Sequence, residues 1–116
     1  MTDKVKKKFI RQGDVFLMSV DSIPTGIAKV PAVKGRVILA YGETTGHHHS
    51  LALSRRITLF RDDGSGGTMY LDVGGKTPAT LEHQEHTALK VPVGQYKVTI
   101  QRTYSGKDKV AKRVVD

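Results

Sequence analysis

The chain contains no cysteine, so it has no disulfide framework, and any metal ion must be held by nitrogen and oxygen ligands. It has no run of eighteen apolar residues, which excludes a transmembrane helix, and its charged first ten residues lack the apolar stretch of a signal peptide. We therefore expect a cytoplasmic protein without membrane association. Tryptophan is absent and aromatic content is 6%, but 38% hydrophobic residues in a chain of 116 suffice for one compact core.

Glutamate is scarce, and its distribution together with histidine is the most informative feature of the sequence. All three glutamates and all five histidines lie in two windows, residues 43–49 and 82–86, which make up about a tenth of the chain. Surface glutamates are normally spread out, so this confinement predicts a local site that combines imidazole and carboxylate groups. The eight residues are Glu43, His47, His48, His49, Glu82, His83, Glu85 and His86.

The net charge of +8 is concentrated at the ends of the chain. The first eight residues contribute +3 and the last ten contribute +2, where solvated tails are common. The basic character is compatible with a phosphate-bearing partner, including nucleic acid, through non-specific electrostatics. Solubility and solvated ends explain the same charge equally well.

Short β-rich runs alternate with turn signals along the chain and predict seven to nine short strands in a small barrel or sandwich. The clearest run is 95–104, in which Tyr96, Val98 and Ile100 share one face. The best helix candidate is 78–89, but it has no sustained apolar stripe and an extended form fits its flanks better. The Arg55–Arg56 pair is expected to be a solvated strand edge. We expect a basic extension over residues 1–10 and a single β domain over 11–116.

The spacing of the histidines favours a metal site. Residues 47 and 49 share one face of an extended segment, about 7 Å apart. Residues 83 and 86 would lie on opposite faces of a regular strand, so they converge only if the second window turns sharply, as at a hairpin tip. Neutral imidazoles suit zinc, iron, nickel, copper or manganese, with a carboxylate as ligand or supporting group. The predicted metal ligands are His47, His49, His83 and His86, assisted by Glu43 or Glu85.

Two other hypotheses explain the same residues without a metal. In the first, one imidazole is a general base and another a general acid for RNA or phosphodiester cleavage, or the chain binds nucleotides. Arg102 and Tyr104 follow an alternating strand and would neutralise a phosphate, although an ordinary strand end explains them as well. In the second, the chain is a binding or inhibitor module of phage type, without catalysis. The candidate catalytic residues are Glu43, Glu85, Arg102 and Tyr104. The candidate partners are a small molecule or a phosphate-bearing ligand.

Several blocks of the sequence occur in a fixed order: Gln12-Gly-Asp-Val15, Gly42-Glu-Thr-Thr-Gly-His47 with His49, His83-x-Glu-His86, Pro92-x-Gly-x-Tyr96 and Gln101-Arg-x-Tyr104. In these blocks the chain resembles a family of short uncharacterised bacterial and phage proteins, over roughly residues 11–104. This resemblance implies no particular activity. The two histidine segments followed by Pro-x-Gly are also loosely similar to the cupins, which are β-barrels that hold a metal with histidine and glutamate. The chain departs from the cupin ligand set because Leu53 and Ser54 stand where a glutamate would follow.

Overall fold

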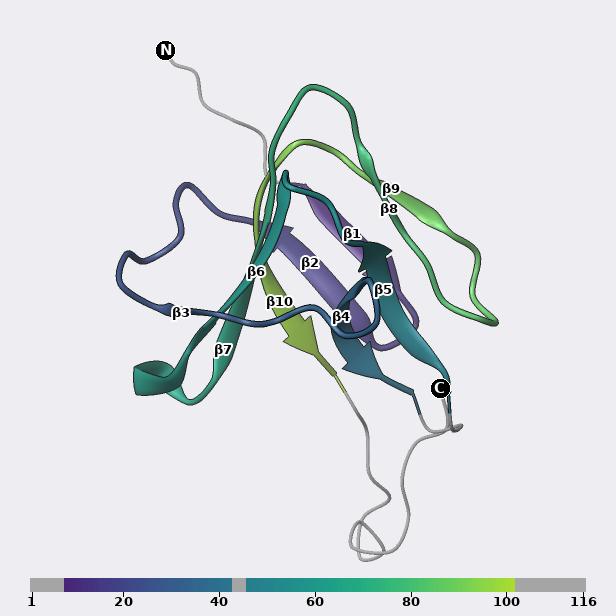
Figure 1. Cartoon of the computed structure of the whole chain (residues 1–116), viewed down its shortest axis with the longest axis horizontal. Coiled ribbons are helices and arrows are strands. Elements are labelled where there is room, and N and C mark those ends of the chain that lie inside the picture. The colour runs from purple at the N-terminus through teal and green to yellow at the C-terminus, as the bar shows by residue number, and fades with distance from the viewer. Residues whose placement is uncertain (1–7, 43–45, 102–116) are drawn as a thin grey trace, which may run out of the picture.

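The computed structural model describes residues 8–42 and 46–101, and these residues form an all-β fold, as the sequence predicts (Figure 1). The 78–89 segment forms one strand, a loop and the first residue of the next strand, and contains no helix. Among the described residues, no helix has the length and hydropathy needed to cross a bilayer. The elements are β1 (Phe9–Gln12), β2 (Val15–Ser19), β3 (Ala28–Lys29), β4 (Arg36–Tyr41), β5 (His48–Ala52), β6 (Ile57–Asp62), the short 3-10 helix η1 (Asp63–Ser65), β7 (Thr68–Val73), β8 (Ala79–Leu81), β9 (Leu89–Val91) and β10 (Gly94–Ile100).

The strands form one large antiparallel sheet and two hairpins. The large sheet has the order β1-β2-β10-β7-β6-β3, and the hairpins are β4–β5 and β8–β9. The hairpins are connected to each other by a bridge between Ser50 and Glu82, with reciprocal N–H···O=C bonds of 2.9 and 2.8 Å. Within the described residues the sheets do not close into a barrel, so of the two predicted architectures the sandwich-like one fits.

A largely aliphatic core lies between the large sheet and the two hairpins. Consecutive side chains along a strand point to opposite faces of the sheet. Leu17, Leu71 and Val98 therefore point inward and are buried, while the residues next to them in each strand point outward. Tyr96 is the aromatic residue of the buried core, and its hydroxyl donates a 2.7 Å hydrogen bond to the carbonyl of Pro92. Burial raises the pKa of this phenol above its ordinary value. The core residues are Val15, Leu17, Val37, Leu39, Ala40, Leu51, Ile57, Leu59, Leu71, Val73, Ala79, Leu81, Val91, Tyr96 and Val98.

The turn between β1 and β2 brings a third segment to the histidine windows. Gln12 pairs with Val15, so Gly13 and Asp14 form a two-residue hairpin turn. Gly13 has a φ of +60°, which fits the first central position of a type II′ turn, where glycine is preferred. The turn leaves Gln12 buried at the end of the core, with 3% of its surface exposed.

Arg56 connects the start of β6 to the segment between β7 and β8, which corrects the expectation that the Arg55–Arg56 pair is solvated as a whole. Its guanidinium donates to the carbonyls of Gly74 at 2.9 Å, Thr77, and Pro78 at 3.1 Å. Arg55 next to it is exposed, as expected. A planar fork with several donors can hold three carbonyls at once, because the five N–H groups of arginine point in fixed directions.

Candidate metal centre

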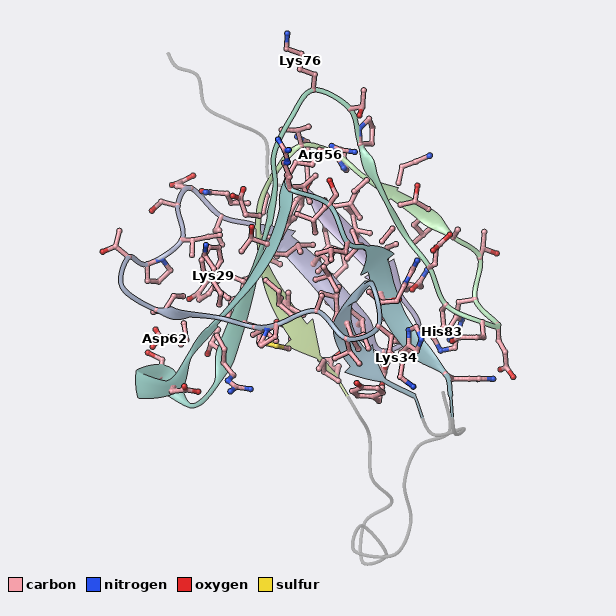
Figure 2. The ribbon with its side chains drawn as sticks, viewed as in Figure 1. Lys29, Lys34, Arg56, Asp62, Lys76 and His83 are labelled. Atoms are coloured by element: carbon pink, nitrogen blue, oxygen red, sulfur yellow. The ribbon has the colours of Figure 1, made fainter. Side chains whose placement is uncertain are left out.

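Three histidines from the two windows converge at one end of the core. His49 lies on β5, where alternation places it on the same side as the core residue Leu51, and its side chain is fully buried. His83 and His86 lie in the loop that joins β8 and β9, and Figure 2 shows His83 between this loop and β5. One ring nitrogen from each of the three histidines lies within 4.8 Å of the others. This group, His49, His83 and His86, is called the histidine trio below.

The second window, residues 82–86, turns sharply, which is the condition under which the sequence predicts that His83 and His86 converge. The Nδ1 atom of His83 accepts the backbone N–H of Glu85 at 3.0 Å and of His86 at 3.3 Å, which closes the chain around the His83 ring. The rings of His83 and His86 consequently lie 4.5 Å apart between their centroids. The bridge between Ser50 and Glu82 fixes the start of this turn against β5.

Gln12 orients the His49 ring. The amide Nε2 of Gln12 donates to the carbonyls of Leu81 and Thr87, both at 3.0 Å, so its Oε1 must be the acceptor of the 2.8 Å bond with Nδ1 of His49. His49 therefore carries a proton on Nδ1, and in the neutral ring its Nε2 is the unprotonated nitrogen. A hydrogen bond that fixes the tautomer from the far side of the ring is typical of histidines that bind metals. The same amide ties β1 to both ends of the loop that carries the other two histidines.

Asp14 and Gly13 bring the β1–β2 turn into contact with the histidine trio. An Oδ1 atom of Asp14 lies 3.4 Å from Nε2 of His49, and only 11% of the Asp14 side chain is exposed. Gly13 leaves room for two rings, since a Cβ atom at this position would lie 2.7 Å from Nε2 of His86 and 3.1 Å from Cε1 of His49. The turn therefore places the carboxylate of Asp14 beside His49, and the missing side chain of Gly13 leaves space for the His49 and His86 rings.

Two further predicted residues, His47 and Glu85, lie beside the trio. The ring of His47 packs edge-on against His83, with 5.6 Å between centroids, outside the group of three. Its Nδ1 lies 3.7 Å from the carboxylate of Glu85, whose side chain is largely exposed. Glu43, Arg102 and Tyr104 lie outside the described residues, so the structure carries no account of them.

His48 faces away from the trio, into a polar network on the opposite side of β5. Its Nδ1 lies 2.9 Å from the hydroxyl of Ser50, and its backbone N–H donates to Oε1 of Gln84 at 2.8 Å. Arg36 donates to the same hydroxyl at 3.0 Å and forms an ion pair with Glu82. These groups border a pocket of about 410 Å³, and His83 forms the wall that this pocket shares with the trio. The pocket is lined by Arg36, His48, Ser50, Glu82, His83 and Gln84.

Sequence reasoning about the site missed Gln12 and Asp14. The signal available in the sequence was the Gly13–Asp14 pair between two β-rich runs, which is typical of a two-residue hairpin turn. Gln12 and Asp14 both lie in the Gln12-Gly-Asp-Val15 block that carries part of the family resemblance. They could not be assigned to the site because the partners of Gln12 are 69 and 75 residues away in the sequence.

The fold and the site define an all-β domain with a buried histidine cluster that has the geometry to hold a metal ion. The chain belongs to the family described as "Domain of unknown function (DUF8820)", whose model matches residues 11–101. A search of the curated proteins and a search of the solved structures found no match. The match spans the β1–β2 turn, β5 and the 82–88 loop, so all three segments of the site lie within the family domain.

Proposed function

We propose that this protein binds a divalent transition-metal ion through His49, His83 and His86. The observation that supports this proposal is that one ring nitrogen from each histidine lies within 4.8 Å of the others, in a largely buried setting. Adjacent ligand atoms of a tetrahedral zinc site are about 3.3 Å apart, given bonds of about 2.0–2.1 Å. Small side-chain rotations would therefore bring the three nitrogens to ligand distances. For His83 to coordinate, the rotation must also release the backbone N–H groups of Glu85 and His86 from its Nδ1, because these bonds leave the proton of the neutral ring on Nε2. The absence of cysteine and the imidazole donors favour zinc, iron, nickel, copper or manganese.

Asp14 and Gln12 support the same proposal from outside the trio. The 3.4 Å between the Asp14 carboxylate and Nε2 of His49 is close to the separation of two neighbouring ligands on one ion. Gln12 holds His49 in the tautomer whose Nε2 is able to coordinate. The three histidines alone would leave one position for water or substrate, as in catalytic zinc sites, whereas Asp14 as a fourth ligand would close the site. The neighbouring polar pocket of about 410 Å³ is of a size that admits a small molecule.

Metal analysis of chelator-free protein, followed by calorimetric titration of zinc, nickel and manganese into EDTA-stripped protein, tests the proposal. We expect one ion per chain in the wild type and a rise in Kd of at least about 100-fold in His49→Ala and in His86→Ala. His48→Ala is the matched control, because this neighbouring histidine faces the opposite side of β5. A protein that binds no metal, or a His48→Ala variant that loses as much affinity as the others, would contradict the proposal.

A second candidate function, metal-independent acid–base catalysis, is favoured by the hydrogen bonds of His83. Because Nδ1 of His83 accepts two backbone N–H groups, its neutral ring carries the proton on Nε2, whereas His49 has its proton on Nδ1. The two rings, 4.3 Å apart between centroids, thus combine a proton donor and a proton acceptor. Cleavage of labelled RNA that persists in EDTA and disappears in His49→Ala would support this function against the metal site. No cleavage with intact metal binding would exclude it.

A further inference from the structure

The outer face of the large sheet carries an unbroken cross-strand row of aromatic, apolar and basic side chains. The register pairs Phe9 with Met18, Met18 with Lys97, Lys97 with Tyr70, Tyr70 with Phe60, and Phe60 with Lys29. Directly opposite residues in a sheet point to the same side, so all members of the row share one face. The row runs from β1 to β3 across all six strands: Phe9, Met18, Lys97, Tyr70, Phe60 and Lys29.

A second, shorter row adds another ring and another cation. Arg11 pairs with Phe16, and Phe16 pairs with Thr99. The rings of Phe9 and Phe16 lie 5.3 Å apart, and the Arg11 guanidinium lies 5.0 Å from the centre of the Phe16 ring. All three phenylalanines of the chain therefore lie on this outer face, and none belongs to the buried core. Burying phenylalanine is favourable, so its placement outside the core needs an explanation.

The face is accessible to a partner. Phe9 is 55% exposed and Met18 46%, and the side chains of Lys97 and Thr99 are also exposed. Phe16, Tyr70 and Phe60 are partly exposed, as expected for rings that lie flat on an open sheet. This face is the side of the large sheet opposite to the core. Lys29, at one end of the row, and His83, of the histidine trio, lie at opposite sides of the view in Figure 2.

The charge of the face selects the class of partner. Arg11, Lys97 and Lys29 are interleaved with the rings, whereas two acidic residues of the face lie in neighbouring rows, Asp72 beside Gln95 and Asp62 beside Thr68. In the sequence, three lysines end directly before Phe9, and the whole chain carries +8. A second copy of the chain would place these cations against one another in a two-fold contact, which is unfavourable. A polyanion with flat apolar groups complements both properties of the face.

We propose that this outer sheet face binds single-stranded nucleic acid by stacking bases on its aromatic rings. The rings form two platforms, Phe9 with Phe16 and Tyr70 with Phe60, and Lys97 of β10 lies between them. The strands that carry Phe16 and Tyr70 are two strand spacings apart, about 10 Å, with Lys97 placed to contact the intervening phosphate. Stacking on sheet aromatics combined with lysine–phosphate contacts is the physical basis of binding to single strands. A duplex does not offer its bases to such a flat face.

Fluorescence anisotropy with a labelled 15-nucleotide oligo(dT) tests this proposal, using the full chain. We expect binding that weakens as salt is raised, and Kd values about fivefold or more higher in Phe16→Leu and in Phe60→Leu, because each loses one stacking contact. Leucine keeps apolar bulk on the sheet, and melting curves verify that the variants are folded. Lys97→Gln should lower the slope of log Kd against log salt by about one. The matched control is Tyr41→Leu, since Tyr41 is an exposed aromatic residue on β4, outside the large sheet.

An abasic deoxyribose-phosphate oligomer of the same length separates stacking from charge alone. We expect it to bind less tightly than oligo(dT). Equal Kd values for the two oligomers, or unchanged Kd values in Phe16→Leu and Phe60→Leu, would overturn the proposal. A wild-type chain that self-associates through this face, so that Phe16→Leu converts a dimer to a monomer, would overturn it as well. His49→Ala should bind oligo(dT) as the wild type does, which keeps this test independent of the metal site.

Discussion

Replacing Gly13 by alanine is a sharp local perturbation of the histidine trio. The new Cβ would lie 2.7 Å from Nε2 of His86, whereas carbon and nitrogen atoms in ordinary contact are about 3.5 Å apart. The His86 ring must therefore move by about 0.8 Å. Metal–ligand distances tolerate only about 0.2 Å, so a shift of this size removes His86 from a bound ion or distorts the whole set. We expect Gly13→Ala to raise the Kd for zinc by at least about tenfold.

The same substitution also strains the backbone, and a matched glycine isolates that effect. An alanine at positive φ costs about 1–2 kcal/mol of folding free energy. Gly26 has a φ of +78°, and a Cβ placed there would have nothing within 4 Å. Gly26→Ala should therefore lose a similar amount of stability in urea unfolding and keep the wild-type Kd for zinc.

Calorimetric titration of zinc into both EDTA-stripped variants gives the comparison. If Gly13→Ala binds zinc as tightly as Gly26→Ala and the wild type, the His86 ring does not bind the ion from its position against Gly13. A site formed jointly by the β1–β2 turn, β5 and the 82–88 loop would then be wrong.

Three other substitutions test the frame that supports the site and the core. Gln12→Ala should lower the free energy of unfolding by about 3 kcal/mol, measured in urea, because it leaves Nδ1 of His49 and two carbonyls without their hydrogen bonds. Arg56→Ala should cost about 2 kcal/mol through the loss of its bonds to three carbonyls, while Arg55→Ala, an exposed neighbour, should stay within about 0.5 kcal/mol of the wild type. Tyr96→Phe should cost about 1–2 kcal/mol at neutral pH through the lost bond to Pro92. Because burial raises the pKa of Tyr96, its contribution is fully present below the ordinary tyrosine pKa of about 10 and is lost as pH rises through the folded-state value. The free energy of unfolding of Tyr96→Phe should therefore not show this decrease at alkaline pH. An equal decrease in the wild type and the variant would show that Tyr96 is not its source.

The strands and the histidine convergence could be predicted largely from local patterns. Alternation alone identifies β10 and the inward side chains of Tyr96 and Val98. The confinement of histidine to two windows predicted a shared site, and the structure joins His49 of the first window with His83 and His86 of the second. The sharp turn at residues 82–86 was a condition of that prediction, and it is met because the backbone N–H groups of Glu85 and His86 donate to Nδ1 of His83.

Features that depend on strand order could not be predicted from the sequence. Gln12 reaches the site only because the β1–β2 turn lies beside the 82–88 loop, and nothing local to Gln12 indicates this neighbour. Each strand pattern indicates that Phe16, Tyr70 and Phe60 face outward, but their alignment in rows requires the order β2-β10-β7-β6 and its register. Long-range pairing of this kind follows from packing of the whole sheet rather than from local propensity.

A crystal structure of the zinc-soaked protein, with anomalous scattering measured on both sides of the zinc edge, shows directly whether the histidine trio holds the ion. We expect one zinc-specific peak bounded by ring nitrogens of His49, His83 and His86, at about 2.0–2.1 Å from each. A peak at His48 or at surface residues alone, or no peak at the trio, would contradict this expectation.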